Sequence, residues 1–286
     1  MQDMLLPRSL LVGLLVLLSM FSSGCSLRKV GYGLAAKYVS QRLIDTFAIE
    51  GRDKIVAERA IRDIHKWHRQ SELPRYVTLI DGLTDRLRDG MSDDDFRWLQ
   101  QQGDEAMARL ADKFAPPAAD VLSRLREDQL VAAERNLAKS EKERFDKLDQ
   151  SDEKYFAYRL DNTKKTLKTW LGSYTDEQLQ IFAAFHREDR DEERKRREAM
   201  RANRAQLLQA VRSKQGKQEL SAMIVHWMTT RQTAPTPDYQ QNEQRQEQRY
   251  ARLLQQVDRT LSVKQRQHLI AELAAWKQDF VALQAE

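Results

Sequence analysis

The sequence predicts an all-α protein, an elongated multi-helix bundle of antiparallel hairpins with about nine helices after the first 24 residues. Charged residues make up 32% of the 286 residues and the mean hydropathy is -0.71, values that are typical of long-helix proteins. Apolar residues recur at spacings of three and four, the period of a helix with one buried face. Ten Gly and six Pro leave few places for turns, and β-branched residues are too sparse to support strands.

The first 24 residues have the proportions of an export signal. A nearly continuous apolar run extends from Leu10 to Phe21, after the basic residue Arg8 and before three small residues. The run is too short to span a bilayer, which needs about 20 apolar residues, but it fits the apolar region of a secretory signal peptide. The alternative is a buried helix that precedes a buried cysteine. We predict that residues 1–24 are a cleaved signal peptide.

The signal-like segment ends at the only cysteine of the chain, Cys25, within Ser22-Ser23-Gly24-Cys25-Ser26. This segment resembles the lipobox of bacterial lipoproteins, in which the signal is cut before the cysteine and the thiol receives diacylglycerol. The resemblance implies lipidation of Cys25, with an N-acyl chain such as palmitate, and anchoring in the membrane. Because Ser26 is not aspartate, the same rule implies the inner leaflet of the outer membrane, facing the periplasm. Lipidation also accounts for a single cysteine in an exported protein.

Apolar stripes predict nine helices in residues 25–286, which we expect to form a single all-helical domain. The helices are expected at residues 27–49, 55–70, 71–90, 92–114, 118–170, 175–211, 220–228, 236–257 and 262–280. Gly51, Gly90 and Gly172 are expected to stop the first, third and fifth helices. Ser71 suits an N-cap and Pro74 suits a first turn, so a new helix is expected to start between them.

Two proline-containing segments mark the expected sub-boundaries, near residues 115–117 and 233–237. Ala115-Pro116-Pro117 is expected to end a helix, because proline lacks an N–H and clashes with the preceding turn. The helix that follows is then one very long element, residues 118–170, with a weak point at residues 149–152. Thr233-Ala234-Pro235-Thr236-Pro237 is the clearest linker after the signal segment.

The helix expected from Thr175 has no apolar residue between Arg187 and Glu198. Three turns without an apolar anchor are expected to lie away from the core, either as a solvated face or as a binding surface. Acid–base pairs four residues apart are expected to support the helix there. These pairs are Asp191–Lys195, Glu192–Arg196 and Glu193–Arg197.

Three expected helix starts share a capping pattern, with Ser92, Thr175 or Ser262 followed three residues later by Asp or Gln. The last two are capping boxes, in which the hydroxyl accepts from the N3 amide and the Gln side chain reaches back to the cap. Tyr174-Thr175-Asp176-Glu177-Gln178 and Leu261-Ser262-Val263-Lys264-Gln265 also resemble the LTxxQ motif of small periplasmic helical chaperones. Capping alone remains the alternative interpretation.

Two stretches resemble the hallmarks of an uncharacterised family of proteobacterial lipoproteins. The residues that carry the resemblance are Trp67, His68, Arg69, Glu72, Leu73, Pro74 and Tyr76 in the first stretch, and Trp170, Gly172, Thr175 and Gln178 in the second. The resemblance implies an all-helical envelope lipoprotein and no particular activity. We expect these residues to be structural.

His65, His68 and Glu72 are the candidate metal ligands, because their spacing places three donors on adjacent turns of one helix. The expected restart at Ser71 argues against such a site, and histidine near a helix C-terminus is favourable through the helix dipole alone. Glu72 would then pair with Arg69 or Arg75. We predict no cofactor and no catalytic residue, since the sequence contains neither a phosphate-binding glycine loop nor a nucleophile and base in a familiar pattern.

Charge and compartment together indicate the class of partner. A net charge of +5 and a pI near 9.2 raise nucleic acid as a partner, but an exported location argues against it and favours anionic lipid or cell-wall polymer. We expect a non-enzymatic, lipid-anchored binding or chaperone-like module that contacts envelope proteins or unfolded polypeptides. The alternatives are a structural or assembly tether of the envelope and a metal-dependent enzyme.

Overall fold

The computed structural model describes residues 25–229 and 237–285, which are all-α, as the sequence predicts. The elements in chain order are α2 (Cys25–Phe47), α3 (Gly51–Trp67), the π-helical turn η1 (His68–Glu72), α4 (Leu73–Leu87), α5 (Asp93–Leu122), α6 (Glu127–Phe145), α7 (Asp152–Leu171), α8 (Asp176–Arg212), α9 (Lys217–Thr229), α10 (Pro237–Arg259) and α11 (Val263–Gln284). The predicted signal peptide and nearly all of the 233–237 linker lie outside the described residues. In the described ranges, no helix combines the length and the apolar character that crossing a bilayer requires.

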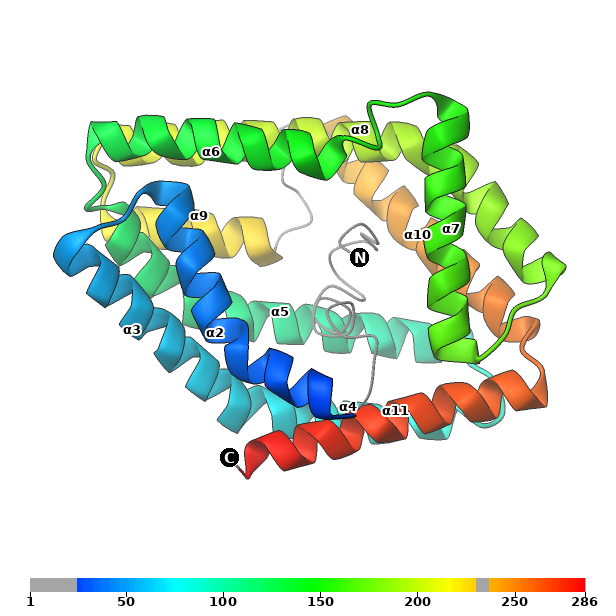
Figure 1. The fold of residues 1–286 in the computed structure, drawn as a ribbon. Helices are drawn as coiled ribbons and strands as arrows, with labels where there is room; N and C mark the ends of the chain where they lie inside the picture. Colours follow the sequence, from blue (N-terminus) through cyan, green and yellow to red (C-terminus); the bar gives the residue numbers. More distant parts are fainter. Residues whose placement is uncertain (1–24, 230–236, 286) are drawn as a thin grey trace.

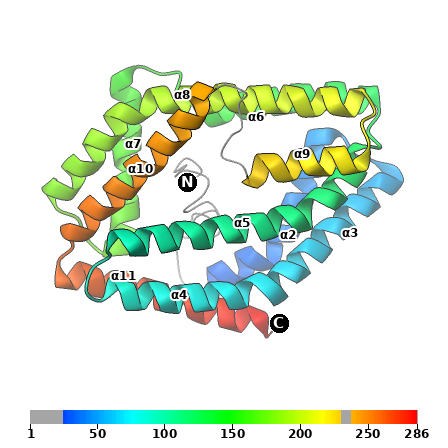
Figure 2. The same ribbon diagram turned by 180° about the vertical axis from the view of Figure 1, so that it is seen from behind.

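The helices form a frame, which two opposite views show (Figures 1 and 2). Helices α6 and α8 run along one side, and α4, α5 and α11 run along the opposite side. The two sides are joined by α7 and α10 at one end and by α2 and α3 at the other, and α9 lies between α8 and α5. The most extensive pairings, α5 with α9 and α4 with α11, join helices that are far apart in the sequence.

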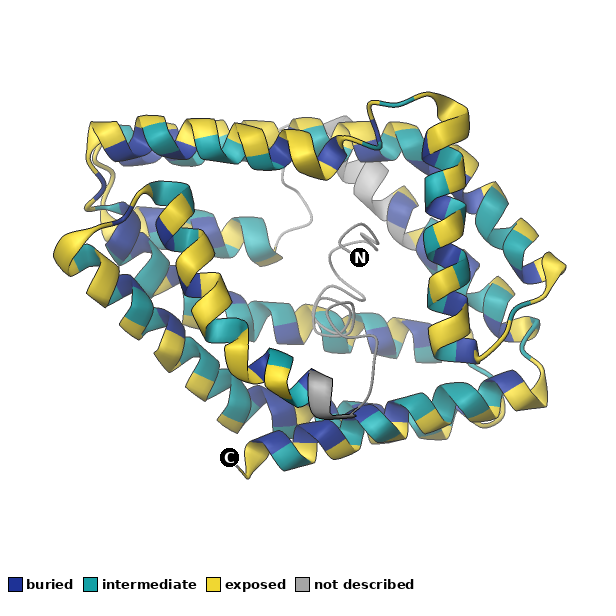
Figure 3. Cartoon of the chain, viewed as in Figure 1, coloured by how far each residue is buried: buried dark blue, intermediate teal, exposed yellow. Residues whose placement is uncertain are grey.

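The buried apolar residues gather in separate clusters where helices of the frame meet (Figure 3). The first cluster joins parts of α2, α3, α5, α6, α8 and α9, and includes Leu130 and Leu220. The second joins the start of α2 with α4, α5 and α11, and includes Leu73 and Trp276. Two smaller clusters form around Phe145 on α6 and around Tyr250 on α10.

Helix α5 continues through Pro116 and Pro117, so the break expected there is wrong. Ala111, Ala115 and Ala119 recur every four residues, and each is completely buried. Their small side chains allow α5 and α9 to pack closely in the most extensive pairing of the fold. This tertiary packing outweighs the local cost of two prolines.

The expected long helix over residues 118–170 is also wrong, because the chain breaks twice. The first break precedes α6, where the Gln129 side chain accepts from the Arg126 amide at 3.1 Å and donates to the Ala48 carbonyl at 2.8 Å. The second precedes α7, where the Ser151 side chain caps the amide of Lys154. This second break confirms the weak point predicted at residues 149–152.

The segment from Arg187 to Glu198 does not lie away from the core, contrary to the prediction. Asp189 is 0% exposed and Glu193 is 6% exposed, because both face Arg159 on α7. The predicted Glu193–Arg197 pair is replaced by contacts with other helices: Arg197, for example, binds Glu141 on α6, with 2.9 Å between Nε and Oε1. Asp191 and Glu192 instead pair three residues further along α8, with Arg194 and Lys195. The apolar surface is supplied by the facing helices, whose aromatic rings lie under arginine side chains of the segment.

Candidate functional site

The π-helical turn η1 joins α3 to α4 without interruption, so the predicted restart at Ser71 is wrong. The extra residue of a π turn rotates the following helix relative to the preceding one. Glu72, at the end of this turn, is 1% exposed. It accepts two hydrogen bonds from Arg109 on α5, from Nε at 2.9 Å and from Nη2 at 3.0 Å. Arg75 approaches the same carboxylate at 3.7 Å, and is one of the two partners predicted for Glu72, Arg69 or Arg75.

The two histidines of this region bind Tyr32 of α2. The Tyr32 hydroxyl lies 2.9 Å from Nδ1 of His68, and Nε2 of His65 lies 3.0 Å from the Tyr32 carbonyl oxygen. Burial raises the pKa of Tyr32 to about 12. It lowers the pKa of His68 to about 4, against the opposing effect of Glu72. At neutral pH the pair is therefore a neutral phenol and a neutral imidazole, which hold α2 against the joint between α3 and α4.

Each of the three candidate metal ligands is held by another residue of the protein in this arrangement. His65 and His68 contact Tyr32, and Glu72 binds Arg109. In the part of the chain that the structure describes, no group of three or more His, Cys, Asp or Glu side chains is placed to hold a metal ion. The geometry at η1 is that of a structural joint.

The two LTxxQ-like starts of α8 and α11 lie against each other. Both capping boxes form as predicted. The side chains of Gln178 and Gln265, 0% and 3% exposed, are bonded to each other through both amides, with nitrogen–oxygen distances of 3.1 and 2.9 Å. Each amide nitrogen also donates to a backbone carbonyl just before the opposite helix. Gln178 of α8 donates to Thr260, which precedes α11, and Gln265 of α11 donates to Ser173, which precedes α8. The two caps therefore form one closed polar contact.

Both family-like stretches pack onto α11 through a row of aromatic rings. Tyr76 of the first stretch lies 6.1 Å from Phe280, and Phe280 lies 5.7 Å from Trp276. Trp276 stacks with Trp170 of the second stretch, at a centroid distance of 6.3 Å. Gly172 ends α7 with a φ of 73°, as its predicted role as a helix stop requires.

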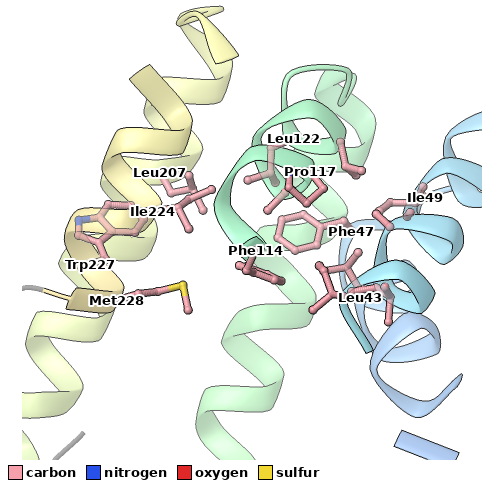
Figure 4. Close-up of a pocket in the computed structure, with 16 residues that line it drawn as sticks. Leu43, Phe47, Ile49, Phe114, Pro117, Leu122, Leu207, Ile224, Trp227 and Met228 are labelled. Atoms are coloured by element: carbon pink, nitrogen blue, oxygen red, sulfur yellow. The ribbon is translucent and has the colours of Figure 1, made fainter. Parts of the chain in front are cut away.

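One feature with the character of a binding site is an apolar pocket in the first core cluster (Figure 4), with a volume of about 240 Å³. Helices α2, α3, α5, α8 and α9 all contribute to it, and all sixteen lining residues are apolar. Trp227 and Met228, at the end of α9, line one side and are only partly buried. Phe47 and Phe114 face them from α2 and α5.

The pocket lining has no polar group to orient a small polar molecule. Ligand sites for small molecules combine an apolar lining with a few placed polar groups, whereas this pocket offers only hydrophobic burial and dispersion. It suits an apolar group that is carried and positioned by a larger molecule. Its volume exceeds that of a roughly 150 Å³ engineered cavity that binds benzene.

The pocket and the partner of Glu72 were not among the residues predicted from sequence. Arg109 is one of two arginines on α5, and no local pattern distinguishes it. The pocket residues match ordinary core positions of five helices, so only their packing reveals the space that they leave. The sole available signal was Pro117 within an apolar stretch, which we interpreted as a break.

Cys25 begins α2, so a helix starts at the predicted lipidation site without an intervening loop. Its side chain lies outside the described part of the structure.

A family model described as "Family of unknown function (DUF6279)" matches residues 45–240. No match was found among curated proteins or among solved structures. The matched range contains both family-like stretches, whereas α11, onto which both pack, lies beyond it.

Proposed function

We propose a function for this chain, which belongs to the DUF6279 family of unknown function over residues 45–240. The proposed role is that of a lipid-anchored envelope protein that binds apolar segments of other polypeptides. The observation that carries the proposal is the apolar pocket between α2, α3, α5, α8 and α9. An unfolded or partly folded envelope protein presents the kind of side chain that this pocket buries, attached to a backbone that lies outside it.

The energy available from the pocket suits transient binding. Full burial of one large aliphatic or aromatic side chain contributes about 1.5–3 kcal/mol. A single pocket of this size therefore favours weak and reversible association, which is the behaviour of a chaperone-like module. Charged side chains around the frame add electrostatic contacts that depend on the client.

The binding proposal is tested by filling the pocket. Ala60 lines it on α3, and Ala60→Phe places a ring in the space that a client side chain would take. Reduced insulin serves as the aggregating client and light scattering as the readout. We expect the wild type to suppress aggregation at stoichiometric excess and Ala60→Phe to lose most of this effect.

The matched control is Ala138→Phe, which adds the same ring at an exposed position of α6. It should suppress aggregation as the wild type does. No suppression by the wild type, or equal suppression by both variants, would remove the proposed binding role. Photo-crosslinking from position 228 in cells separates the alternative: many transient partners support a chaperone-like role, and one dominant stable partner supports an assembly tether.

Lipid anchoring has a separate test. Metabolic labelling with palmitate should mark the wild-type chain and leave Cys25→Ser unlabelled, and the variant should keep its signal segment. Label on the Cys25→Ser chain would contradict the proposed anchor and, with it, the envelope location.

A further inference from the structure

The inner face of α2 is fixed to the body of the protein. The Arg28 side chain donates to Asp279 on α11 at 2.6 Å, and its guanidinium lies over the Trp276 ring at 5.0 Å. One turn later, Tyr32 is 5% exposed and its hydroxyl contacts His68. These contacts set the rotation of α2 about its own axis, and hence which residues face outward.

The outer face of α2 carries an apolar stripe. Val30, Leu34 and Tyr38 follow one another every four residues and start two residues after Arg28, which places them about 200° around the helix from the inner face. They are 56%, 57% and 52% exposed. Of the eight large apolar residues that are exposed in the described part of the chain, these three and Val39 fall within ten residues of α2. Such concentration is unlike the scattered exposure that is normal on soluble surfaces.

The charged residues that α2 itself carries along this stripe are all basic. From residue 25 to residue 44 the chain contains four basic residues and no acidic one. Arg28 is bound to the body, but Lys37 is exposed between Leu34 and Tyr38. Basic residues next to an exposed apolar face are complementary to an anionic lipid surface, where the apolar side chains enter the headgroup region and the lysines meet phosphate.

The position of the stripe relative to Cys25 determines its surroundings. Helix α2 begins at Cys25 itself, and Val30 lies five residues further, about 7.5 Å along the helix axis. A lipid chain on Cys25 would therefore hold the stripe at the bilayer surface with no flexible spacer between them. We propose that the outer face of α2 rests on the anionic membrane surface and so fixes the orientation of the whole frame; this rests on the proposed lipidation of Cys25.

The test places a probe on the stripe. In the lipidated chain the sulfur of Cys25 is bound to lipid, so Leu34→Cys provides the only free thiol for an environment-sensitive fluorophore. The labelled protein is reconstituted in phosphatidylglycerol vesicles whose acyl chains are brominated near the headgroup. We expect a blue shift and at least a twofold loss of fluorescence. The control is Val263→Cys, which is 75% exposed at the start of α11 and should show little of either effect.

Three outcomes overturn the proposal. Equal quenching at both positions would show that α2 is not the contacting face. A blue shift that depends on protein concentration in detergent, without vesicles, would identify a second copy of the chain as the occupant. Quenching that is unchanged by Lys29→Glu with Lys37→Glu, or in zwitterionic vesicles, would exclude the anionic surface.

Mass spectrometry of the N-terminal peptide distinguishes this proposal from the one on which it rests. An unlipidated Cys25 would refute the anchoring, whereas a lipidated Cys25 with an unquenched probe at position 34 would refute only the surface contact.

Discussion

Glu72 shows how a single buried charge can fix the packing of two helices, α4 and α5, against each other. The side chain is 1% exposed, and its carboxylate accepts hydrogen bonds from Nε and Nη2 of Arg109. A carboxylate removed from water costs several kcal/mol unless it is paired with good geometry. Because Glu72 ends the π turn and Arg109 lies on α5, the pair determines how α4 and α5 lie against each other.

Removing this carboxylate should therefore be severe. We expect Glu72→Ala to lower the free energy of unfolding by about 3–5 kcal/mol, because Arg109 is left partly buried without its counter-charge. Urea denaturation at 25 °C measures the loss. Asp112→Ala, which removes an exposed acid from the same helix as Arg109, should change the value by less than about 0.5 kcal/mol. A double variant, Glu72→Met with Arg109→Met, should recover most of the stability, and failure to do so would contradict the charge argument.

His186 is the residue whose titration should be most visible in the stability of the protein. It is 6% exposed, its Nε2 lies 2.8 Å from the Thr163 hydroxyl, and burial together with the nearby Arg159 lowers its pKa to about 3. The unfolded chain binds a proton at about pH 6.5 and the folded chain does not. Its contribution to stability is thus complete above pH 6.5 and is lost as the pH falls toward 3.

We expect the free energy of unfolding of the wild type to fall between pH 7 and pH 4.5 by about 2 kcal/mol more than that of His186→Gln. Glutamine keeps a polar contact with Thr163 but does not titrate. The exposed His226→Gln variant is the control and should follow the wild type. Parallel stability curves for wild type and His186→Gln would mean that folding leaves the pKa of His186 unshifted, and would contradict this prediction.

At the scale of elements, local signals identified the helix ends more reliably than they identified helix surroundings. The capping boxes at Thr175 and Ser262 and the stop at Gly172 depend on residues within four positions, and all three are confirmed. Pro116 was misinterpreted as a helix break because the packing that keeps α5 helical there is provided by α9, about 100 residues later. The segment from Arg187 to Glu198 was misplaced for the same reason, since its apolar partners lie on α6 and α7.

The two capping boxes are coupled, and their coupling is measurable. Gln178→Ala and Gln265→Ala should each lower the free energy of unfolding by about 2 kcal/mol, because each leaves the other buried amide with an unsatisfied group. The double variant should cost clearly less than the sum of the two, with a coupling energy of about 1 kcal/mol in a double-mutant cycle.

The comparison for this cycle is Asp95→Ala, which removes the side chain that completes the capping box of Ser92. It should cost about 1 kcal/mol and should be additive with Gln178→Ala. Strict additivity between Gln178→Ala and Gln265→Ala would instead mean that the two caps act independently.

At the scale of the whole molecule, the frame distributes its core over separate clusters. The all-α class and the alternation of helices with short turns could be predicted from the spacing of apolar residues in the sequence. The closure of the frame could not, because the pairings that close it, such as α4 with α11, join residues about 200 positions apart. Their complementarity depends on side chains like Arg109 and Trp276 that no local pattern relates to their partners.

Separate clusters imply that stability is not shared equally around the frame. Leu220 and Leu73 are both 0% exposed, but Leu220 belongs to the first core cluster and Leu73 to the second. Leu220→Ala should cost about 2–5 kcal/mol and should accelerate native-state amide exchange in α9 and in the second half of α5. Leu73→Ala should instead accelerate exchange in α4 and α11. The two variants would share one exchange pattern only if the frame unfolded as a single cooperative unit, and hydrogen exchange with mass spectrometry decides between these outcomes.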